Sequence, residues 1–242
     1  MILEQEVVLV TGASGNIGRG IAEGLAAAGA AVVVHCHSNA KAADELAQAI
    51  GGRAVQADLA DPQAVDDMLA AVTPTMLVNN AARQDVAALP DIGVEDWRAM
   101  LATNLDGAFH VMQRCAAAWA KDDRGGAIVN IASIEASDPA TGHAHYATSK
   151  AALLMLTRAA ALEYGPDAIR VNAVSPGLIY RAGLEIDWPD GVERWLERAP
   201  LGRLGTPQDV ADAVLFLLSP AARWISGTNL VVDGGMSAQS RW

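Results

Sequence analysis

Tyr146 and Lys150 are the two residues whose types and spacing most directly indicate chemistry. The chain holds three Tyr and three Lys in 242 residues, and one of each lies four residues apart in HYATSK, 145–150. Residues four apart share a helix face, so the Lys150 ammonium can lie near the Tyr146 phenol. A free phenol has a pKa of about 10, which a nearby cation lowers by stabilising the phenolate. Tyr146 could then take a proton from an alcohol or give one to a carbonyl oxygen.

Ser133 and Asn104 are candidates for the same site. Ser133 ends NIAS, thirteen residues before Tyr146, and Asn104 lies in TNLDGAF. A serine hydroxyl can hold the reacting oxygen and stabilise its developing charge. Each residue alone also has a structural explanation: Ser133 as a turn residue, Asn104 as a polar helix residue, and Tyr146 as a core aromatic with Lys150 snorkelling beside it.

A glycine-rich turn near the start of the chain indicates a nucleotide site. Val7–Val10 is followed by TGASGNIGRG, 11–20, and then by a segment of helical period. Glycine permits positive φ and close backbone approach, and a helix N-terminus offers free N–H groups to a pyrophosphate. A bare turn at a helix start is the alternative, and the strand-turn-helix context favours the nucleotide.

The elements that must position these residues alternate along the chain. Apolar runs of strand length alternate with segments of helical period, so we expect a doubly wound parallel α/β sheet of Rossmann type with helices on both faces. The expected strands are Val7–Val10, Ala31–His35, Arg53–Ala57, Met76–Asn79, Ala127–Ile131, Arg170–Val174 and Asn229–Val232. The expected helices are 17–28, 40–50, 62–72, 94–120, 144–164 and 207–218. No linker divides residues 1–242, which we predict to form one domain with a lid at 180–206.

The order of these motifs resembles the classical short-chain dehydrogenase/reductase family. TGxxxGxG, Asp58-Leu59, NNAA at 79–82, Asn104, Ser133, Tyr146, Lys150, SPG at 175–177 and VDGG at 232–235 follow one another across nearly the whole chain. One departure is Asn16 at the middle glycine position, where a residue tolerant of left-handed backbone could preserve the turn. Gly15 stands where many members carry Arg, which removes one contact to a 2′-phosphate.

The resemblance implies an NAD(P)-dependent oxidoreductase acting on a carbonyl or secondary alcohol. Its catalytic set would be Asn104, Ser133, Tyr146 and Lys150, with Asn104 anchoring a proton-relay water and Lys150 binding the nicotinamide ribose. Its expected cofactor contacts are Gly12, Ser14, Asn16, Ile17, Gly18, His35, His37, Ser38, Asn39, Asp58, Leu59, Asn80, Ala81, Ala82, Tyr146, Lys150, Pro176, Gly177 and Ile179.

The end of the second strand bears on the choice of cofactor. An acidic residue there would bind a ribose 2′-OH and repel a 2′-phosphate. The sequence has Cys36 at the usual Asp position, and His35, His37, Ser38 and Asn39 around it could donate to a phosphate. We therefore expect NADP(H), with NAD(H) possible if the histidines are only residues of a strand edge. A sugar or polyol dehydrogenase using NAD is the alternative enzyme, and a dinucleotide sensor without turnover is the alternative outside enzymes.

The substrate side is expected between Ser133 and Tyr146 and after Gly177. The candidate pocket residues are Glu135, His143, Arg181, Leu184 and Trp188. Arg181 stands where many relatives have a Thr that contacts the cofactor amide, and it could meet a phosphate, an anionic substrate group or solvent.

Composition excludes several classes of protein. The net charge of −11 argues against nucleic-acid binding, and no apolar run is long enough to span a membrane. The two cysteines, Cys36 and Cys115, fit no metal-ligand or disulfide pattern. We expect a cytoplasmic protein with a small-molecule substrate, no metal and, by the resemblance, a homotetramer or homodimer.

Overall fold

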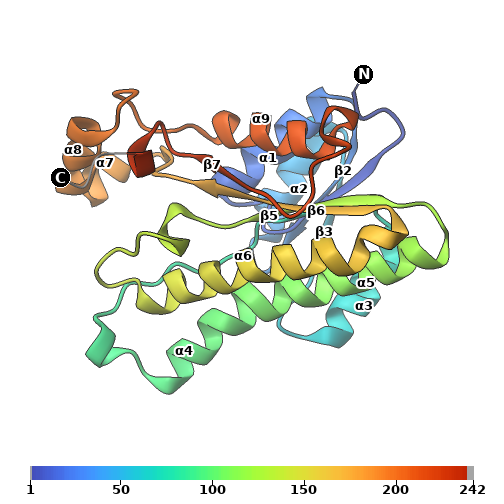
Figure 1. The fold of residues 1–242 in the computed structure, drawn as a ribbon, viewed down its shortest axis with the longest axis horizontal. Coiled ribbons are helices and arrows are strands. Elements are labelled where there is room, and N and C mark those ends of the chain that lie inside the picture. Colours follow the sequence, from blue (N-terminus) through green and yellow to red (C-terminus); the bar gives the residue numbers. More distant parts are fainter. Residues whose placement is uncertain (1, 239–242) are drawn as a thin grey trace.

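The structure is a computed structural model, which describes residues 2–238 and has a seven-stranded parallel sheet at its centre (Figure 1). The strand order is β3-β2-β1-β4-β5-β6-β7. The strands are β1 Val7–Val10, β2 Ala31–Cys36, β3 Arg53–Gln56, β4 Met76–Asn79, β5 Gly126–Ile131, β6 Ile169–Pro176 and β7 Asn229–Val232. The Rossmann-type sheet and its seven strands are confirmed, and no strand boundary moves by more than two residues.

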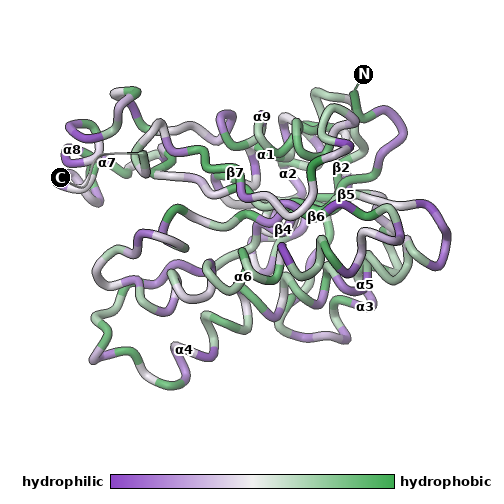
Figure 2. The backbone as a smooth tube through the Cα atoms, viewed as in Figure 1, coloured by the Kyte–Doolittle hydropathy of each residue, from purple (hydrophilic) through white to green (hydrophobic). Residues whose placement is uncertain are grey.

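Helices cover both faces of the sheet. The helices α1 Asn16–Ala27, α2 Ala40–Ile50 and α9 Pro207–Leu218 lie on one face, and α3 Pro62–Val72, α5 Gly107–Lys121 and α6 Ala144–Tyr164 lie on the other (Figure 1). Two apolar clusters fill the spaces between the layers. Hydrophobic segments, green in Figure 2, run through the strands between these layers, as a sheet buried on both faces requires.

The strand order reverses between the neighbouring strands β1 and β4. From β1 the chain continues to β2 and β3 on one side of the sheet, and from β4 it continues to β5, β6 and β7 on the other. Because all strands are parallel, the segments that follow β1, β2, β4, β5 and β6 emerge at one edge. Ligands of doubly wound sheets bind outside the carboxyl ends of the strands at such a switch point. The motifs that the sequence places after strands are therefore gathered at this edge.

The segment expected as one helix, 94–120, is three pieces. The helix α4 Val94–Leu101 passes into a π-helical turn, Ala102–Asp106, before α5 begins at Gly107. Asn104 is in this turn and is buried. π-bulges are frequent at functional sites because they turn a side chain away from the regular helical register. Apolar periodicity alone does not reveal such a turn, so the expectation of an uninterrupted helix is corrected.

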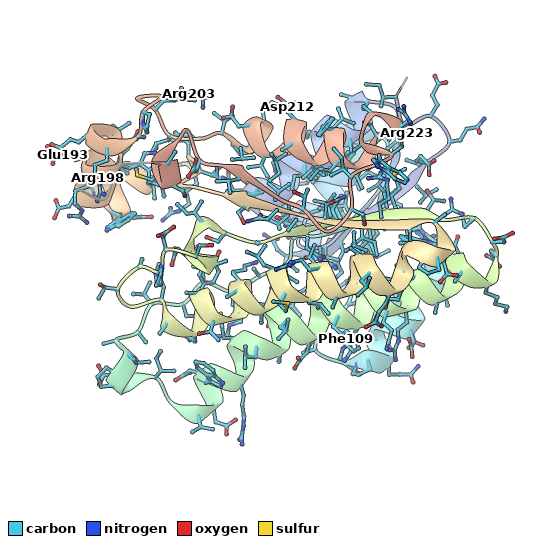
Figure 3. All side chains as sticks on the ribbon, in the orientation of Figure 1. Phe109, Glu193, Arg198, Arg203, Asp212 and Arg223 are labelled. Carbon is cyan, nitrogen blue, oxygen red and sulfur yellow. The ribbon has the colours of Figure 1, made fainter. Side chains whose placement is uncertain are left out.

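Two short helices interrupt the connection between β6 and α9. They are α7 Leu184–Asp187 and α8 Pro189–Arg198, and they project beyond the end of the sheet (Figure 1). In Figure 3, Glu193 and Arg198 of this projection lie at the end of the molecule opposite Arg223. Both helices lie within the segment 180–206, for which the sequence predicts a lid.

Candidate functional site

A cleft of about 1700 Å³ runs along the carboxyl edge of the sheet. It begins at the turn after β1 and ends under α7 and α8. All the residues predicted for the catalytic set line it except Asn104, which is buried directly behind it. All the predicted cofactor contacts and substrate-pocket residues line it as well.

The turn after β1 is shaped for close backbone approach. Gly12 has φ +63°, and a Cβ at this position would lie 2.7 Å from the Cα of Ala81. A Cβ at Gly18 would lie 2.5 Å from the Gly12 carbonyl oxygen. No side chain caps the N-terminus of α1, and its first turn has no acidic residue. These features fit a pyrophosphate, whose charge the helix N-terminus would stabilise.

Asn16 does not adopt the left-handed backbone that its position suggests. It is the first residue of α1, and positive φ in this turn occurs at Gly12. Its side-chain amide donates a hydrogen bond of 2.7 Å to the Tyr180 carbonyl. The substitution is therefore tolerated because the position is helical, and it links the nucleotide turn to the segment before α7.

Thr11, which follows β1, and Asn80, which follows β4, join the nucleotide turn to the end of β4. Thr11 is not among the site residues that were predicted from the sequence. The Thr11 hydroxyl accepts hydrogen bonds from the backbone N–H groups of Asn80 and Ala81, at 2.9 and 3.0 Å. The Asn80 amide donates to the carbonyls of Thr11 and Gly12. The TG and NNA motifs are thus one hydrogen-bonded unit, and the threonine of TG is the signal that could have revealed it.

His35 is engaged inside the protein. Its Nδ1 accepts from the Gly12 N–H at 3.0 Å, and its Nε2 lies 3.1 Å from the Ala57 carbonyl oxygen. A carbonyl only accepts and a backbone N–H only donates, so the ring must be neutral with its proton on Nε2. Burial lowers the pKa of His35 to about 4, which agrees with a neutral ring. The expectation that His35 donates to a phosphate is corrected, because neither ring nitrogen is available.

The other residues after β2 remain open to a ligand. His37, Ser38 and Asn39 line the cleft and are exposed, and the His37 Nε2 lies 3.9 Å from the Asp58 carboxylate. The side-chain Oδ1 of Asn39 caps α2 by accepting from Ala42 N–H at 3.2 Å. Cys36 is buried in the core and, as a cysteine, brings no carboxylate to the cleft.

The catalytic residues meet at the centre of the cleft. Ser133 follows β5, and Tyr146 and Lys150 lie one turn apart on α6. The Lys150 Nζ is 5.7 Å from the centre of the Tyr146 ring and donates to the Ile131 carbonyl at 2.8 Å. A hydrogen bond with Ser133 acts on the phenol and favours its ionised form.

Burial dominates the ionisation of this pair. It raises the pKa of Tyr146 to about 12, which outweighs the lowering by Ser133. It lowers the pKa of Lys150 to about 8. The pKa of Tyr146 is therefore raised in the protein, contrary to the expectation from the sequence, and at neutral pH the phenol carries its proton and can donate it.

Asn104 orders the opposite wall of the site. Its side chain accepts from Arg83 N–H at 2.8 Å and donates to the Arg83 carbonyl and to the Ser149 hydroxyl, both at 3.0 Å. Ser149, which the sequence analysis did not single out, in turn donates to the Tyr146 carbonyl at 2.7 Å. Asn104 is thereby tied to the helix turn that carries Tyr146 and Lys150.

Aromatic side chains close the substrate end. Trp188 and the buried Leu184 line the cleft from α7 and the residue after it. Trp195 lies against Gly177, where a Cβ would come within 2.5 Å of the indole. Arg181 forms an ion pair of 2.7 Å with Asp187 at the surface. The structure thus gives Arg181 a partner that the sequence did not suggest, a carboxylate of this chain.

Comparison with known proteins agrees with this geometry. A family model described as enoyl-(acyl carrier protein) reductase matches residues 12–237. The chain is 38% identical to L-rhamnose 1-dehydrogenase (NAD(P)(+)) of Azotobacter vinelandii over 98% of each chain. It is 32% identical to glucose 1-dehydrogenase 2 of Bacillus subtilis over 97% of this chain and 96% of that one.

A solved structure is equally similar over its whole length. The putative short-chain alcohol dehydrogenase of Sinorhizobium meliloti matches with a TM-score of 0.92 and 35% identity over 98% of each chain. The chain belongs to the short-chain dehydrogenase/reductase family. As an oxidoreductase of this family, it transfers a hydride between a nicotinamide dinucleotide and a carbonyl or alcohol carbon.

No helix within residues 2–238 is long and apolar enough to cross a membrane. The same residues contain no cluster of His, Cys, Asp and Glu that could hold a metal ion.

Proposed function

We propose that Tyr146 is the proton donor and acceptor of the reaction, that Ser133 binds the reacting oxygen and that Lys150 supplies positive charge beside them. The observation that carries this assignment is the convergence of the three side chains in the cleft that begins at the nucleotide turn. A nicotinamide dinucleotide supplies the hydride acceptor or donor when it is bound. Gly12, the first turn of α1, Asn80 and Lys150 would hold it.

Each protein group has a defined task in this scheme. In reduction, the protonated phenol of Tyr146 gives its proton to the carbonyl oxygen as negative charge develops there. The Ser133 hydroxyl stabilises the same charge. In oxidation the proton returns to Tyr146, and the Lys150 cation favours the phenolate. Asn104 positions the helix turn through Ser149.

Replacement of Tyr146 by Phe tests this assignment. We expect kcat to fall by roughly three orders of magnitude or more, since general acid–base catalysis contributes about 10²–10⁴-fold. Tyr164→Phe is the matched control, because Tyr164 lies on the same helix outside the cleft. Turnover of Tyr146→Phe within tenfold of the wild type would exclude this role.

We propose a preference for NADP(H). The support is the absence of a carboxylate at Cys36 and the presence of His37, Ser38 and Asn39 at the cleft wall beside the N-terminus of α2. His35 does not support the preference, because both of its ring nitrogens are bonded within the protein. Fluorescence titration should give a Kd for NADPH at least tenfold below that for NADH, a difference of about 1.4 kcal/mol. Equal affinities, or tighter NADH binding, would overturn the preference and favour NAD(H) as the cofactor.

We propose further that residues 180–206 act as a substrate lid on a single catalytic domain. We also propose that the protein is cytoplasmic and that it forms a homotetramer. The free, buried cysteines support a reducing compartment. Exposed apolar side chains on α5 and α6, namely Phe109, Met155 and Leu162, support an assembly through these helices. Sedimentation at micromolar concentration should give the tetramer mass; a monomer would contradict the assembly.

A further inference from the structure

A carboxylate–imidazole pair lies beside the catalytic tyrosine and is not used by the proposed mechanism. The Glu135 Oε2 lies 2.8 Å from the His143 Nδ1. Both side chains line the cleft and keep only 16% and 18% of their surface exposed. The pair is therefore a mostly buried polar group in the part of the cleft where the substrate would react.

Both members are tied to catalytic residues. Glu135 N–H donates to the Ser133 hydroxyl at 3.1 Å, which holds the Glu135 backbone next to that hydroxyl. His143 precedes the first residue of α6, and its ring meets the Tyr146 ring edge-on with centroids 6.0 Å apart. The pair thus lies in the cleft beside Ser133 and Tyr146, the residues that would hold the reacting atom.

The pair leaves hydrogen-bonding capacity for a ligand. Within residues 2–238, the structure gives no hydrogen-bond partner to the His143 Nε2 or to the Glu135 Oε1. With the proton on Nδ1, Nε2 is an acceptor, and the carboxylate oxygen is an acceptor in any case. A hydroxyl donor satisfies either atom, and a hydroxyl could also accept from Nε2 if the imidazole were protonated.

The charge of Glu135 selects against anionic groups at this place. Its carboxylate is close enough to Tyr146 to oppose ionisation of the phenol. The same field would repel a carboxylate or phosphate of a substrate, whereas it favours the positive end of an O–H bond. A purely apolar substituent would leave half-buried polar atoms without partners, which is costly.

We propose that Glu135 and His143 bind a hydroxyl on the carbon next to the reacting carbon, so that the substrates are vicinal diols and hydroxycarbonyl compounds such as sugars and polyols. This inference rests on the proposed function and names its substrate class. It makes the pair a specificity element, whereas Ser133 and Tyr146 act on any alcohol.

Matched alcohols with and without the second hydroxyl test this proposal. The probes are trans-1,2-cyclohexanediol against cyclohexanol, and butane-2,3-diol against butan-2-ol, oxidised with NADP⁺ or NAD⁺. The wild type should favour each diol in kcat/KM by tenfold or more, since a site built for a hydroxyl rejects the analogue that lacks it. In Glu135→Gln and His143→Leu this preference, the ratio of kcat/KM for each diol to kcat/KM for its mono-alcohol, should fall at least tenfold.

Two further variants separate recognition from structure. His143→Gln keeps an acceptor and a donor and should restore part of the preference that His143→Leu loses. Glu95→Gln makes the same chemical change in an exposed ion pair on α4 and should change nothing. Equal loss for diols and mono-alcohols would show a structural role and overturn the inference.

The failure of the inference differs from the failure of the proposed function. A wild type that turns over carbonyls or alcohols without preferring the diols overturns the inference alone. A wild type that turns over no carbonyl or alcohol overturns both.

Discussion

The two ends of the cleft are built from different parts of the chain. At the nucleotide end, the glycine turn after β1 allows close backbone approach, and hydrogen bonds of Thr11, His35 and Asn80 hold this turn in place. At the substrate end, the surface is side chains, and Trp188 leaves nearly half of its surface exposed. A ligand common to many enzymes can be met by backbone geometry, whereas a particular substrate needs particular side chains. Changes at the first end should therefore affect binding of any cofactor, and changes at the second should affect one substrate at a time.

Gly12→Ala should break the nucleotide end most severely. The new Cβ would meet Ala81 at 2.7 Å with φ at +63°, so the turn must shift. We expect the Kd for the nicotinamide cofactor to rise by roughly 100-fold or more, measured by fluorescence titration.

Gly51→Ala is the matched control for this change. Gly51 has φ +65°, but nothing lies within 4 Å of its Cβ position. It should show the strain of positive φ without an effect on cofactor affinity. Unchanged affinity in Gly12→Ala would contradict a nucleotide site formed by close backbone approach.

Acid should destabilise the same end through His35. Its folded-state pKa of about 4 lies below the unfolded value of 6.5, so the unfolded chain takes up the proton first. Its contribution is complete above pH 6.5 and is lost as the pH falls towards 4, by about 3 kcal/mol of unfolding free energy.

Urea unfolding of the wild type and His35→Gln between pH 7 and pH 4 measures this loss. The variant should lack that part of the pH dependence, whereas His37→Gln, which changes an exposed histidine, should keep it. The same slope in all three proteins would mean that His35 is not the titrating group.

The smallest effect is expected at the substrate end, from Trp188→Ala. Loss of the indole removes apolar contact worth about 1–2 kcal/mol, so kcat/KM for a good substrate should fall roughly tenfold. Cofactor affinity should stay within twofold. Trp224→Ala, which removes a fully exposed indole outside the cleft, should leave both unchanged. A larger effect of Trp188→Ala on the cofactor than on the substrate would reverse the comparison.

The contrast between the two ends also explains what the sequence could predict. Strands and most helices follow from alternation of apolar runs and helical period, because buried parallel strands leave a direct mark in composition. The gathering of Gly12, Asn80, Ser133 and Tyr146 at one edge follows from parallel strands alone.

The errors arose where a residue's partners are distant in sequence. The imidazole of His35 is a side chain that can bind phosphate, but its ring bonds to Gly12 and Ala57, which only the fold brings together. The side chain of Asn104, in the π-turn, likewise bonds to Arg83 and Ser149, which are distant from it in sequence. The Glu135–His143 contact joins two residues that the sequence named only as separate members of a pocket.

The measurement that tests the account most directly is a cofactor titration of Tyr146→Phe, with turnover assayed on the same preparation. The account predicts a Kd within about threefold of the wild type together with loss of turnover, because binding belongs to the backbone of the nucleotide end and proton transfer to one phenol. Retained turnover, or a Kd that rises as steeply as turnover falls, would contradict it.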